Sequence, residues 1–552
     1  MNEHPLPAYR ILERGESADG EPFLRVEVPV LGRNEVGLIS MRDLGTAPDR
    51  AITRLRVPIL TPSAKRAFLE EAQSVFQTKQ STFRVATKPG WLGRTFVLPD
   101  GTTVPPRSRL SVCLPQDLQR FGENFHSRGT LKGWKRIARL ARGNTRFMLA
   151  ISLSFVGPVA AILRVEEPMF QVFGPPGLGK SSMGEAVAAT WGKGTQSWNN
   201  TANYTELLAS AFNETFLVLD ETRTADHSQS GKMPAILQLV MRLAGGQVRG
   251  RLTDVAAPLR FETPVLSLSN ESLDEIARRW RAEIDDAHRD RLIDVPLDPA
   301  GMFENLHGFE NRAALSAELR RVAGEHHGVA GREFLRRLAE DIRRDRDAIV
   351  KWLQDRRRRY LEAASTQVCS PSRDLERVHQ RFATCYATGC LAIRYEVFPY
   401  DRKELGRALL ACERAHVDHV AQFVRASSRA RRPAPVVDPL ERLRSHVRQN
   451  RSKFVDLREG LIAPSSDHDH DSCPGYVNLG ADGSVEMLFS NALLLRLCGG
   501  RPRLKRLKEE LEECGWLIRD TNRPSTRRAI WKNSPSDRVH VTAVRAALFE
   551  DK

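Results

Sequence analysis

Short apolar runs alternate with helix-prone stretches through the middle of the chain, from about residue 147 to residue 296. The runs at 170–173, 215–219 and 264–268 are mostly apolar, and each is followed directly by glycine or a polar residue. Runs of this kind are typical of strands buried on both faces of a parallel sheet. Because helix-prone stretches separate them, their order predicts an α/β domain with a parallel sheet and helices on its faces.

The residues on either side of this region follow other patterns. Before it, a strand-like run at 23–30, helical spacing at 63–77 after a cap-like start at Thr61, and two strand-like runs within 85–99 predict a small α/β module. After it, residues 313–416 have largely helical spacing and predict a helical lid. The apolar stretch at 147–163 is short for a membrane span and contains Ser, Gly and Pro, so we expect a buried core helix instead.

The last part of the chain follows a stretch of linker composition at 427–439, rich in Ser, Arg and Pro. Helices are predicted at 440–447 and 504–511, and two strands at 515–519 and 527–531 joined by a turn. This order is typical of a winged helix, whose basic residues suit DNA phosphates; contact with a protein partner is the alternative. The basic residues around its second helix are Arg501, Arg503, Lys505, Arg506 and Lys508.

The loop after the first apolar run matches the complete phosphate-binding pattern G-x-x-x-x-G-K-[ST], between a strand and a helix-prone stretch. Glycines let backbone N–H groups turn toward phosphate oxygens, and the N-terminus of the following helix favours the same anion. Lys180 is expected to contact the β- and γ-phosphates of ATP, and the hydroxyl of Ser181 to bind Mg²⁺. The predicted ATP-binding residues are Gly174, Pro175, Pro176, Gly177, Leu178, Gly179, Lys180, Ser181 and Ser182.

Two acidic residues, Asp220 and Glu221, end the second apolar run. In open α/β sheets, ligands bind at the C-terminal edge of the strands, which is where these carboxylates are expected. The distance along the chain from Lys180 is usual for a Walker A and a Walker B motif. Asp220 is therefore predicted to hold Mg²⁺, directly or through water, and Glu221 to polarise the attacking water.

The third apolar run ends in Ser269 and Asn270. Hydrolytic ATPases with this kind of Walker B motif carry a strand between the P-loop and Walker B strands, and its polar tip contacts the γ-phosphate or the water. Asn270 is the first candidate for this sensor, and Ser269 is the second. The alternative is an ordinary turn residue, or a cap of the helix expected to begin near Ser272.

Three groups of arginines are candidates for further roles. Arg291, or else Arg289, stands before the last core strand, where many ring ATPases place a finger that stabilises the neighbour's γ-phosphate; a salt bridge to a nearby acid is the alternative. Arg249 and Arg251 alternate in a predicted hairpin that faces either a DNA-binding pore or solvent. The candidate lid sensors are Arg332, Arg373, Arg377 and Arg381, among which the sequence does not select.

Composition adds a partner and a compartment to this picture. The 552 residues suffice for roughly three or four domains, and the net charge of +16 favours a polyanionic partner such as DNA. The eight cysteines include no C-x-x-C pair, so we expect reduced thiols and no zinc site. The N-terminus has no signal-peptide pattern, and we expect a cytoplasmic protein with no membrane segment.

Several further stretches occur in a specific order along the chain: Lys88-Pro-Gly-Trp91, Phe96-Val-Leu-Pro-Asp100, Phe155-Val-Gly-Pro158, Trp191-Gly192, Ser197-Trp-Asn199, Val218-Leu-Asp-Glu221, Phe303-Glu-Asn-Leu-His-Gly308, Arg377, Arg381-Phe-Ala383 and Gly389-Cys-Leu-Ala392. In this order they resemble the domain of unknown function 927 family, whose members are P-loop proteins of mobile elements. Some members resemble self-loading helicases of staphylococcal cassette elements, which are similar to minichromosome-maintenance ring helicases with an AAA+ core and a C-terminal winged helix.

The resemblance implies an AAA+-like ATPase with Arg291 in the place of the finger arginine. Here the segment is Asp290-Arg291-Leu292, which departs from the S-R-F of those helicases. Asn270 fits the AAA+ sensor pattern better than the Thr-Gly typical of the 927 family. The predicted parts are an N-terminal α/β module (1–125), a P-loop ATPase core (126–310), a helical lid (311–426), a linker (427–439) and a winged-helix-like domain (440–552).

These features together predict an ATP-hydrolysing ring motor with ATP and Mg²⁺ as cofactors, a homo-oligomer that acts on DNA as a helicase-like replication protein of a mobile element. Two other classes stay open. The first is a nucleotide-switch ATPase or helicase loader that uses the winged helix for protein partners. The second is a kinase or another phosphotransferase, which shares the P-loop but has no reason to oligomerise on nucleotide.

Overall fold

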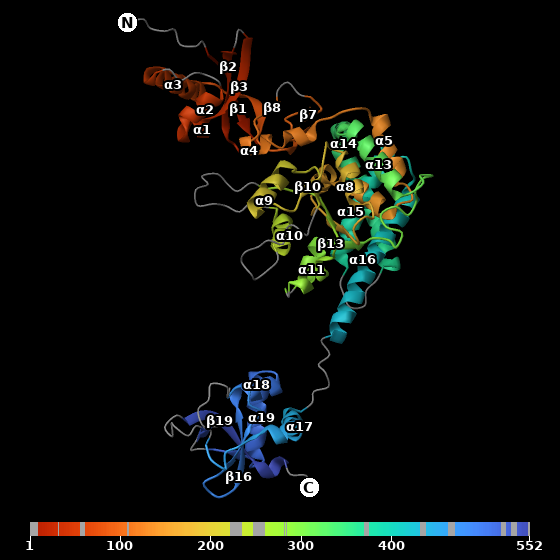
Figure 1. The fold of residues 1–552 in the computed structure, drawn as a ribbon. Coiled ribbons are helices and arrows are strands. Elements are labelled where there is room, and N and C mark those ends of the chain that lie inside the picture. The colour runs from red at the N-terminus through yellow and green to blue at the C-terminus, as the bar shows by residue number, and fades with distance from the viewer. Residues whose placement is uncertain are drawn as a thin grey trace. The chain divides into compact units, whose positions relative to one another are not determined.

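The computed structural model of the chain describes residues 9–30, 33–55, 61–106, 110–220, 235–246, 260–280, 282, 284–368, 375–430, 438–461, 470–519, 526–530 and 538–549. The chain forms two compact units, Met1–Val424 and Arg425–Lys552 (Figure 1). The larger unit holds the sheets and helices that position the candidate nucleotide site, and the smaller unit holds the basic C-terminal residues.

The larger unit begins with a five-stranded mixed sheet in the order β3-β2-β1-β4-β8. The first three strands are antiparallel neighbours, while β4 runs parallel to both β1 and β8. Its strands are β1 (Arg10–Ser17), β2 (Pro22–Val30), β3 (Arg33–Ser40), β4 (Ser81–Ala86) and β8 (Leu110–Val112). The helices α1 (Met41–Thr46), α2 (Pro48–Arg54) and α3 (Pro62–Thr78) accompany this sheet, and α3 begins at the predicted cap Thr61. Phe68 and Ala72 of α3 join the apolar core of the module.

A small antiparallel sheet connects this module to the central core. It consists of β5 (Gly90–Leu92), β6 (Thr95–Val97) and β7 (Thr103–Val104). The backbone N–H of Trp91 donates to Glu214 Oε2 at 2.7 Å, and the Trp91 indole donates to the carbonyl of Pro158 at 3.0 Å. The Lys-Pro-Gly-Trp stretch therefore contacts the core directly. The short α4 (Gln116–Gln119) and the 3₁₀ turn η1 (Gly122–Phe125) follow.

Three helices precede the central sheet: α5 (Leu131–Ala141), α6 (Thr145–Leu153) and α7 (Val156–Leu163). The single core helix predicted at 147–163 is therefore wrong in length, because the chain bends by 58° between α6 and α7. Almost all residues of both helices are buried in the main core. No single helix among the described residues is long and apolar enough to cross a membrane, and only this bent pair reaches that length and composition together.

The central sheet has five parallel strands in the order β10-β11-β12-β9-β13. These are β9 (Met169–Phe173), β10 (Gln196–Ser197), β11 (Leu217–Asp220), β12 (Val265–Ser269) and β13 (Leu292–Pro296). The connecting helices are α8 (Lys180–Ala188), α9 (Ala202–Ala211), α10 (Ala235–Gly245), α11 (Leu273–Arg279) and α12 (Asp286–Arg291). The predicted α/β fold with a parallel sheet is confirmed, and β12 lies between β9 and β11 as expected.

Four helices follow the central sheet: α13 (Arg312–Glu325), α14 (Val329–Gln367), α15 (Glu376–Arg394) and α16 (Arg402–Ala430), the last of which extends past Val424. A kink at Asp345 interrupts α14. Phe382 of α15 packs edge-on against Phe170 of β9, with ring centroids 4.8 Å apart. The helical region is therefore part of the same apolar core as the central sheet, as the shared cluster of buried residues shows.

The smaller unit contains a sheet with the order β14-β15-β16-β19-β17, with β18 also paired to β19. Its strands are β14 (Val455–Asp456), β15 (Tyr476–Leu479), β16 (Val485–Ser490), β17 (Leu517–Ile518), β18 (Thr526–Ala529) and β19 (Arg538–Arg545). Its helices are α17 (Pro439–Asn450), α18 (Asn491–Cys498) and α19 (Arg501–Glu513), with short 3₁₀ turns η3 (Arg451–Lys453) and η4 (Ala546–Phe549). The helices agree with the predicted order.

The predicted hairpin between 515–519 and 527–531 is wrong. Both β17 and β18 pair with β19 and not with each other: Leu517 lies opposite Val544, and Thr526 lies opposite Val541. The prediction missed β19, a strand with several buried residues that pairs with both of them. Neighbouring strands along the sequence are a good first guess for pairing, but an unrecognised third strand changes the partners.

Candidate active site

Residues 174–179 connect the C-terminal end of β9 to α8, and residues 180–182 are the first residues of that helix. Lys180 is buried, and its Nζ donates to the carbonyl oxygens of Gly174 at 2.7 Å and Pro175 at 2.8 Å. These two hydrogen bonds hold the ammonium group of Lys180 against the backbone at the start of the loop. The N–H of Gly174 donates to the carbonyl of Ser269 at 3.2 Å, which fixes the start of the loop against β12.

Gly177 and Gly179 of the loop, like Gly174 before them, have positive φ angles that other residues rarely adopt. Gly177 has φ of 77° and Gly179 has φ of 95°. A Cβ at Gly177 would meet no atom within 4 Å, whereas a Cβ at Gly179 would lie 2.6 Å from Cε2 of Phe303. Gly177 therefore needs only its backbone freedom, while Gly179 also needs the missing side chain. Open space above Gly177 leaves room for a ligand against the backbone.

The remaining loop residues suit a nucleotide phosphate. Pro175, Pro176, Gly177 and Ser181 are exposed, Leu178 and Gly179 are half-buried, and Ser182 is buried. The first N–H groups of α8 have no acceptor within the helix and lie at the end of the same loop, where the helix dipole favours an anion. The donor set of Lys180, the Ser181 hydroxyl and these N–H groups therefore fits the phosphates of ATP.

Asp220 is the last residue of β11, and it acts on Lys180 electrostatically. Burial lowers the pKa of Lys180, and the negative charge of Asp220 opposes this shift. The predicted Mg²⁺ ligands Asp220 and Ser181 thus belong to the same edge of the sheet as the loop. One carboxylate and one hydroxyl are a reasonable protein share for Mg²⁺, which takes further ligands from phosphates and water. Among the described residues, no cluster of three or more His, Cys, Asp or Glu could hold a metal by itself.

Glu221, the predicted water-polarising residue, lies outside the described residues, as do Arg249, Arg251 and Arg373. Their roles stay predictions.

Ser269 is the last residue of β12 and Asn270 follows it, between the ends of β9 and β11. The Ser269 hydroxyl donates to the carbonyl of Glu271 at 2.6 Å, so it supports the turn. Asn270 is half-buried at the same edge. The cap of α11 is Ser272, which forms a capping box with Glu275, so Asn270 does not cap this helix.

Arg291 ends α12 and leads into β13, whose first residue Leu292 lies opposite Met169, the first residue of β9. The phosphate loop begins after Phe173, at the other end of β9. Five residues of strand span roughly 16 Å, so Arg291 stands at the edge opposite its own loop. Its Nη1 donates to the carbonyl of Ala287 at 3.0 Å.

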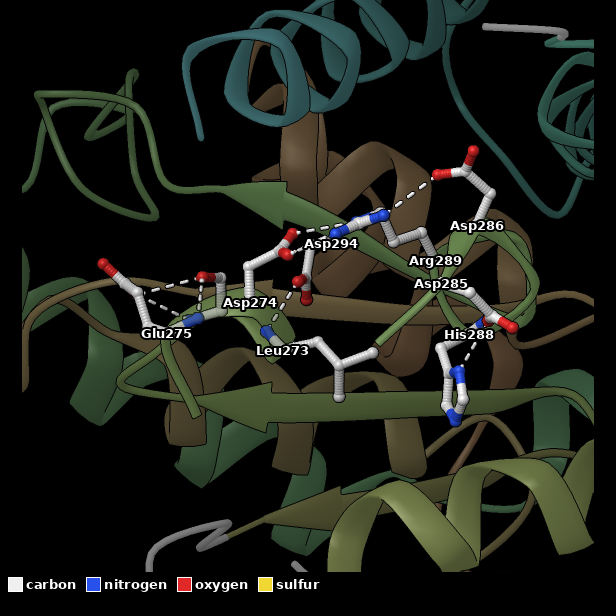
Figure 2. A network of polar contacts seen from close by, with 9 residues as sticks. Leu273, Asp274, Glu275, Asp285, Asp286, His288, Arg289 and Asp294 are labelled. Atoms are coloured by element: carbon white, nitrogen blue, oxygen red, sulfur yellow. Dashed lines mark hydrogen bonds and ion pairs between the residues drawn. The ribbon is translucent and has the colours of Figure 1, made fainter. Parts of the chain in front are cut away.

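Arg289, the second finger candidate, is committed to acidic partners (Figure 2). Its Nη2 lies 2.9 Å from Asp274 Oδ1, and its Nη1 lies 2.9 Å from Asp286 Oδ1. The salt-bridge alternative therefore describes Arg289 well. Arg291 is the better placed of the two for a role outside its own chain.

A line of buried polar side chains crosses the sheet beneath the site, and the sequence analysis missed it. Trp198 Nε1 donates to Ser267 Oγ at 3.0 Å, and Ser267 Oγ donates to Gln171 Oε1 at 2.9 Å. Gln171 Nε2 then donates to Asp294 Oδ1 at 2.7 Å. The signal was visible, since a Gln and an Asp interrupt otherwise apolar strands.

Asp294 carries this line to α11, because its Oδ2 accepts from the backbone N–H of Leu273 at 2.7 Å (Figure 2). Complete burial raises the pKa of Asp294 to about 8. The line therefore joins β12, β9 and β13 to the helix that follows the candidate sensor.

The lid arginines occupy different surroundings. Arg332 donates to Asp100 Oδ2 at 2.6 Å and to the carbonyl of Phe125 at 2.7 Å, which ties α14 to the N-terminal part of the chain. Arg377 is exposed on α15. Arg381 is buried, and its Nη1 donates to the carbonyls of Asp290 and Arg291. In the smaller unit, Arg501, Arg503, Lys505 and Arg506 are exposed on α19, and Lys508 Nζ donates to Asn491 Oδ1 at 2.9 Å.

Comparison with known proteins finds a family match for part of the chain. Residues 47–254 match the family described as Domain of unknown function (DUF927). The resemblance to the 927 family is therefore confirmed over a range that includes the loop at 174–182 and Asp220. No curated protein matches the chain.

Among solved structures, the chain is similar to one described as "SCCmec type IV Cch - active helicase", with a TM-score of 0.52 and 16% sequence identity. The alignment covers 98% of this chain and 94% of that chain. At this identity the likeness shows a shared fold, and it extends over both units.

Proposed function

We propose that the chain is an ATP-hydrolysing ring motor that acts on DNA, a helicase-like replication protein of a mobile genetic element. One observation carries the proposal: the loop with Lys180, the carboxylate of Asp220 and the tip of β12 with Asn270 meet at the C-terminal edge of one parallel sheet. This is where α/β sheets bind ligands. The strand order supports hydrolysis, because β12 brings a polar side chain between the phosphate loop and the metal-binding strand.

In this proposal, Lys180 and the N–H groups of the loop hold the β- and γ-phosphates. Ser181 and Asp220 hold Mg²⁺, which neutralises phosphate charge when bound. Asn270 contacts the γ-phosphate or the attacking water, and Glu221 polarises that water. Lys180 reaches this role by leaving the carbonyls of Gly174 and Pro175, and burial already favours exchanging them for an anionic partner.

The position of Arg291 supports the proposal of a ring. Since it stands at the edge opposite its own phosphate loop, it suits the nucleotide of a neighbouring chain. The finger arginine in ring ATPases stabilises charge on the γ-phosphate during hydrolysis. The active site is then shared between two copies of the chain.

DNA is the partner that the charge distribution favours. The chain carries a net charge of +16, and α19 of the smaller unit exposes Arg501, Arg503, Lys505 and Arg506. Lysine and arginine on an exposed helix suit phosphate contacts, which position a protein on DNA. Arg249 and Arg251 are proposed as further DNA contacts from the larger unit. The fold shared with a helicase supports the same partner.

The test is ATP-dependent unwinding of a labelled forked DNA duplex at low salt, where phosphate contacts are strongest. The wild-type chain is expected to separate the strands, and Lys180→Ala is expected to lose both hydrolysis and unwinding. Lys193→Ala is the matched control, because this exposed lysine lies beyond α8 and outside the loop. Hydrolysis without unwinding at any salt that permits binding would reject the motor.

The other outcomes identify the other classes. Hydrolysis that DNA does not stimulate would favour a nucleotide-switch ATPase or a helicase loader. Glu221→Gln should bind ATP and accumulate as oligomers in a motor. Phosphoryl transfer without nucleotide-dependent oligomers would favour a phosphotransferase.

A further inference from the structure

Arg381 is a buried arginine whose donors are directed at the backbone beside Arg291. Its residue is 6% exposed, and Nη1 donates to the carbonyls of Asp290 and of Arg291, the latter at 2.7 Å. Nη2 donates to Glu166 Oε2 at 3.3 Å, and that carboxylate is largely exposed. Burial lowers the pKa of Arg381, and Glu166 opposes the shift. A buried cation of this kind is costly unless its donors are satisfied in good geometry.

The two carbonyls belong to the C-terminal end of α12, where helix carbonyls lack partners within the helix. A cation at this end is favoured by the helix dipole. The planar guanidinium donates to both carbonyls from one nitrogen, and it thereby fixes the peptide planes of residues 290 and 291. The direction in which the Arg291 side chain leaves the backbone depends on these planes.

Arg381 is itself held in place by the helix that carries it. The next residue, Phe382, is fully buried and packs against Phe170 in the middle of the central sheet, with ring centroids 4.8 Å apart. Glu166 lies in the segment that leads into β9, so Arg381 also contacts the start of the strand that ends in the phosphate loop. The position of Arg381 is therefore fixed by the packing of α15 and by its contact with Glu166.

The opposite side of α12 is fixed by Arg289, which reaches Asp274 on α11 (Figure 2). The helix that ends in Arg291 is thus bound to α15 by Arg381 and to α11 by Arg289. Of these two contacts, only that of Arg381 falls on the carbonyl of Arg291 itself.

We propose that Arg381 is a positioning residue for Arg291: it holds the end of α12 so that Arg291 faces the nucleotide of the neighbouring chain. This inference rests on the proposed function, in which Arg291 completes the site of a neighbour. It gives Arg381 a role other than the phosphate sensor predicted from the sequence. The guanidinium is occupied by backbone carbonyls at the edge opposite the phosphate loop of its own chain.

The first experiment compares steady-state ATP hydrolysis by Arg381→Met, Arg381→Lys and wild type. Arg381→Met is expected to lower kcat at least about tenfold while KM for ATP stays within about threefold, because the nucleotide-binding loop is intact. Arg381→Lys keeps a cation near the helix end and is expected to recover part of the loss, since an ammonium lacks the planar fork. Unchanged kcat in Arg381→Met would overturn the proposal.

The matched control is Arg394→Met, at the far end of the same helix. Arg394 is partly exposed and lies 3.6 Å from Asp341. The variant Arg394→Met removes the same charge from α15 without a contact to α12, so its kcat is expected to equal the wild-type value.

The second experiment mixes variants, and it separates a role toward the neighbour from a role within the chain. Chains with Arg381→Met keep a working phosphate loop, and chains with Lys180→Ala keep a working Arg291. In an equal mixture, some sites combine the two intact halves, so hydrolysis is expected to exceed the mean of the two parents. A mixture of Arg381→Met with Arg291→Ala has no intact Arg291 and is expected to show no gain.

The mixture of Arg291→Ala with Lys180→Ala tests the proposed function separately. If it gains activity while the Arg381→Met mixture does not, the shared site stands and Arg381 acts inside its own chain, which overturns this inference. If neither mixture gains activity, the shared site itself is rejected, and this inference with it. Should Arg381→Met fold poorly in thermal melting, Arg381→Lys replaces it in every mixture with the same expected pattern.

Discussion

Arg289 of α12 and Asp274 of α11 form a buried ion pair between the helix that ends in Arg291 and the helix that follows Asn270 (Figure 2). Nη2 of Arg289 lies 2.9 Å from Oδ1 of Asp274, and Nε lies 3.3 Å from both carboxylate oxygens. The Asp274 side chain is 2% exposed. This ion pair therefore links the segment of Asn270, the proposed sensor, to the segment of Arg291, the proposed finger.

Arg289→Met is expected to destabilise the larger unit by about 3–5 kcal/mol, because it leaves the Asp274 carboxylate buried without its partner. Urea unfolding followed by intrinsic fluorescence measures the change. Asp286→Asn is the control, since Asp286 pairs with the same arginine from an exposed position and should cost below about 1 kcal/mol. Equal losses in the two variants would contradict a special role for the buried partner.

Gly177 and Gly179 are expected to respond differently to replacement by alanine. Gly179→Ala combines a strained backbone with a clash against Phe303, whereas Gly177→Ala adds strain alone. A left-handed conformation costs about 1–2 kcal/mol for a residue with a Cβ, and overpacking adds about 1–3 kcal/mol. Thermal melting without nucleotide should show the larger decrease for Gly179→Ala. The double variant Gly179→Ala with Phe303→Leu should regain part of the loss if the clash is its cause.

The stability of the larger unit is expected to fall as pH rises from about 4.3 to about 8, in part because of Glu167. Burial and the nearby carboxylates of Glu262 and Glu214 raise the pKa of Glu167 to about 8. An unfolded chain has a Glu pKa of about 4.3. Between these values the folded state binds the extra proton, so the free energy of unfolding decreases with pH.

Glu167→Gln removes this ionisation and is expected to raise Tm by about 2–4 °C at pH 8.5, with a smaller gain at pH 5.5. Differential scanning fluorimetry at the two pH values measures it. Glu310→Gln, at an exposed position, is the control and should shift Tm equally little at both. A gain that is larger at pH 5.5 would show that the assigned sign is wrong.

The exposed arginines of α19 are expected to carry part of the DNA affinity. Charge reversal by Arg503→Glu with Arg506→Glu should weaken binding and reduce the slope of log K against log salt by about 2. Fluorescence anisotropy with a labelled duplex over a salt series gives both quantities. Arg458→Glu is the control in the same unit, because Arg458 already pairs with Asp456 at 2.6 Å. An unchanged salt slope in the α19 variant would exclude this helix from the DNA contact.

Local patterns predicted the elements of this protein better than their partners. The strands β2, β9, β11 and β12 were visible as apolar runs, and α3 was visible from its cap at Thr61. These signals depend on residues close together in the sequence. The pairing of β17 and β18 with β19 depends on a strand further along the chain, and no local pattern reports such a partner.

The candidate site divides in the same way. The residue types at Lys180 and Asp220 predict a phosphate loop and a metal-binding strand, and the sheet brings both residues to one edge. The sequence does not distinguish Arg381 from the other candidate lid sensors, because nothing local shows that its guanidinium reaches the carbonyls of Asp290 and Arg291. The polar line through Gln171 and Asp294 likewise depends on which strands lie side by side.

The five residues of β13 separate Arg291 from the edge of the phosphate loop. This separation has a consequence for ATP consumption. Under the proposed function, a chain diffusing alone holds ATP without the cation that completes the reaction, so the nucleotide stays intact. Consumption begins only when a second copy arrives, and specific activity should therefore rise with protein concentration. The length of one short strand thus keeps an isolated chain from hydrolysing ATP unproductively.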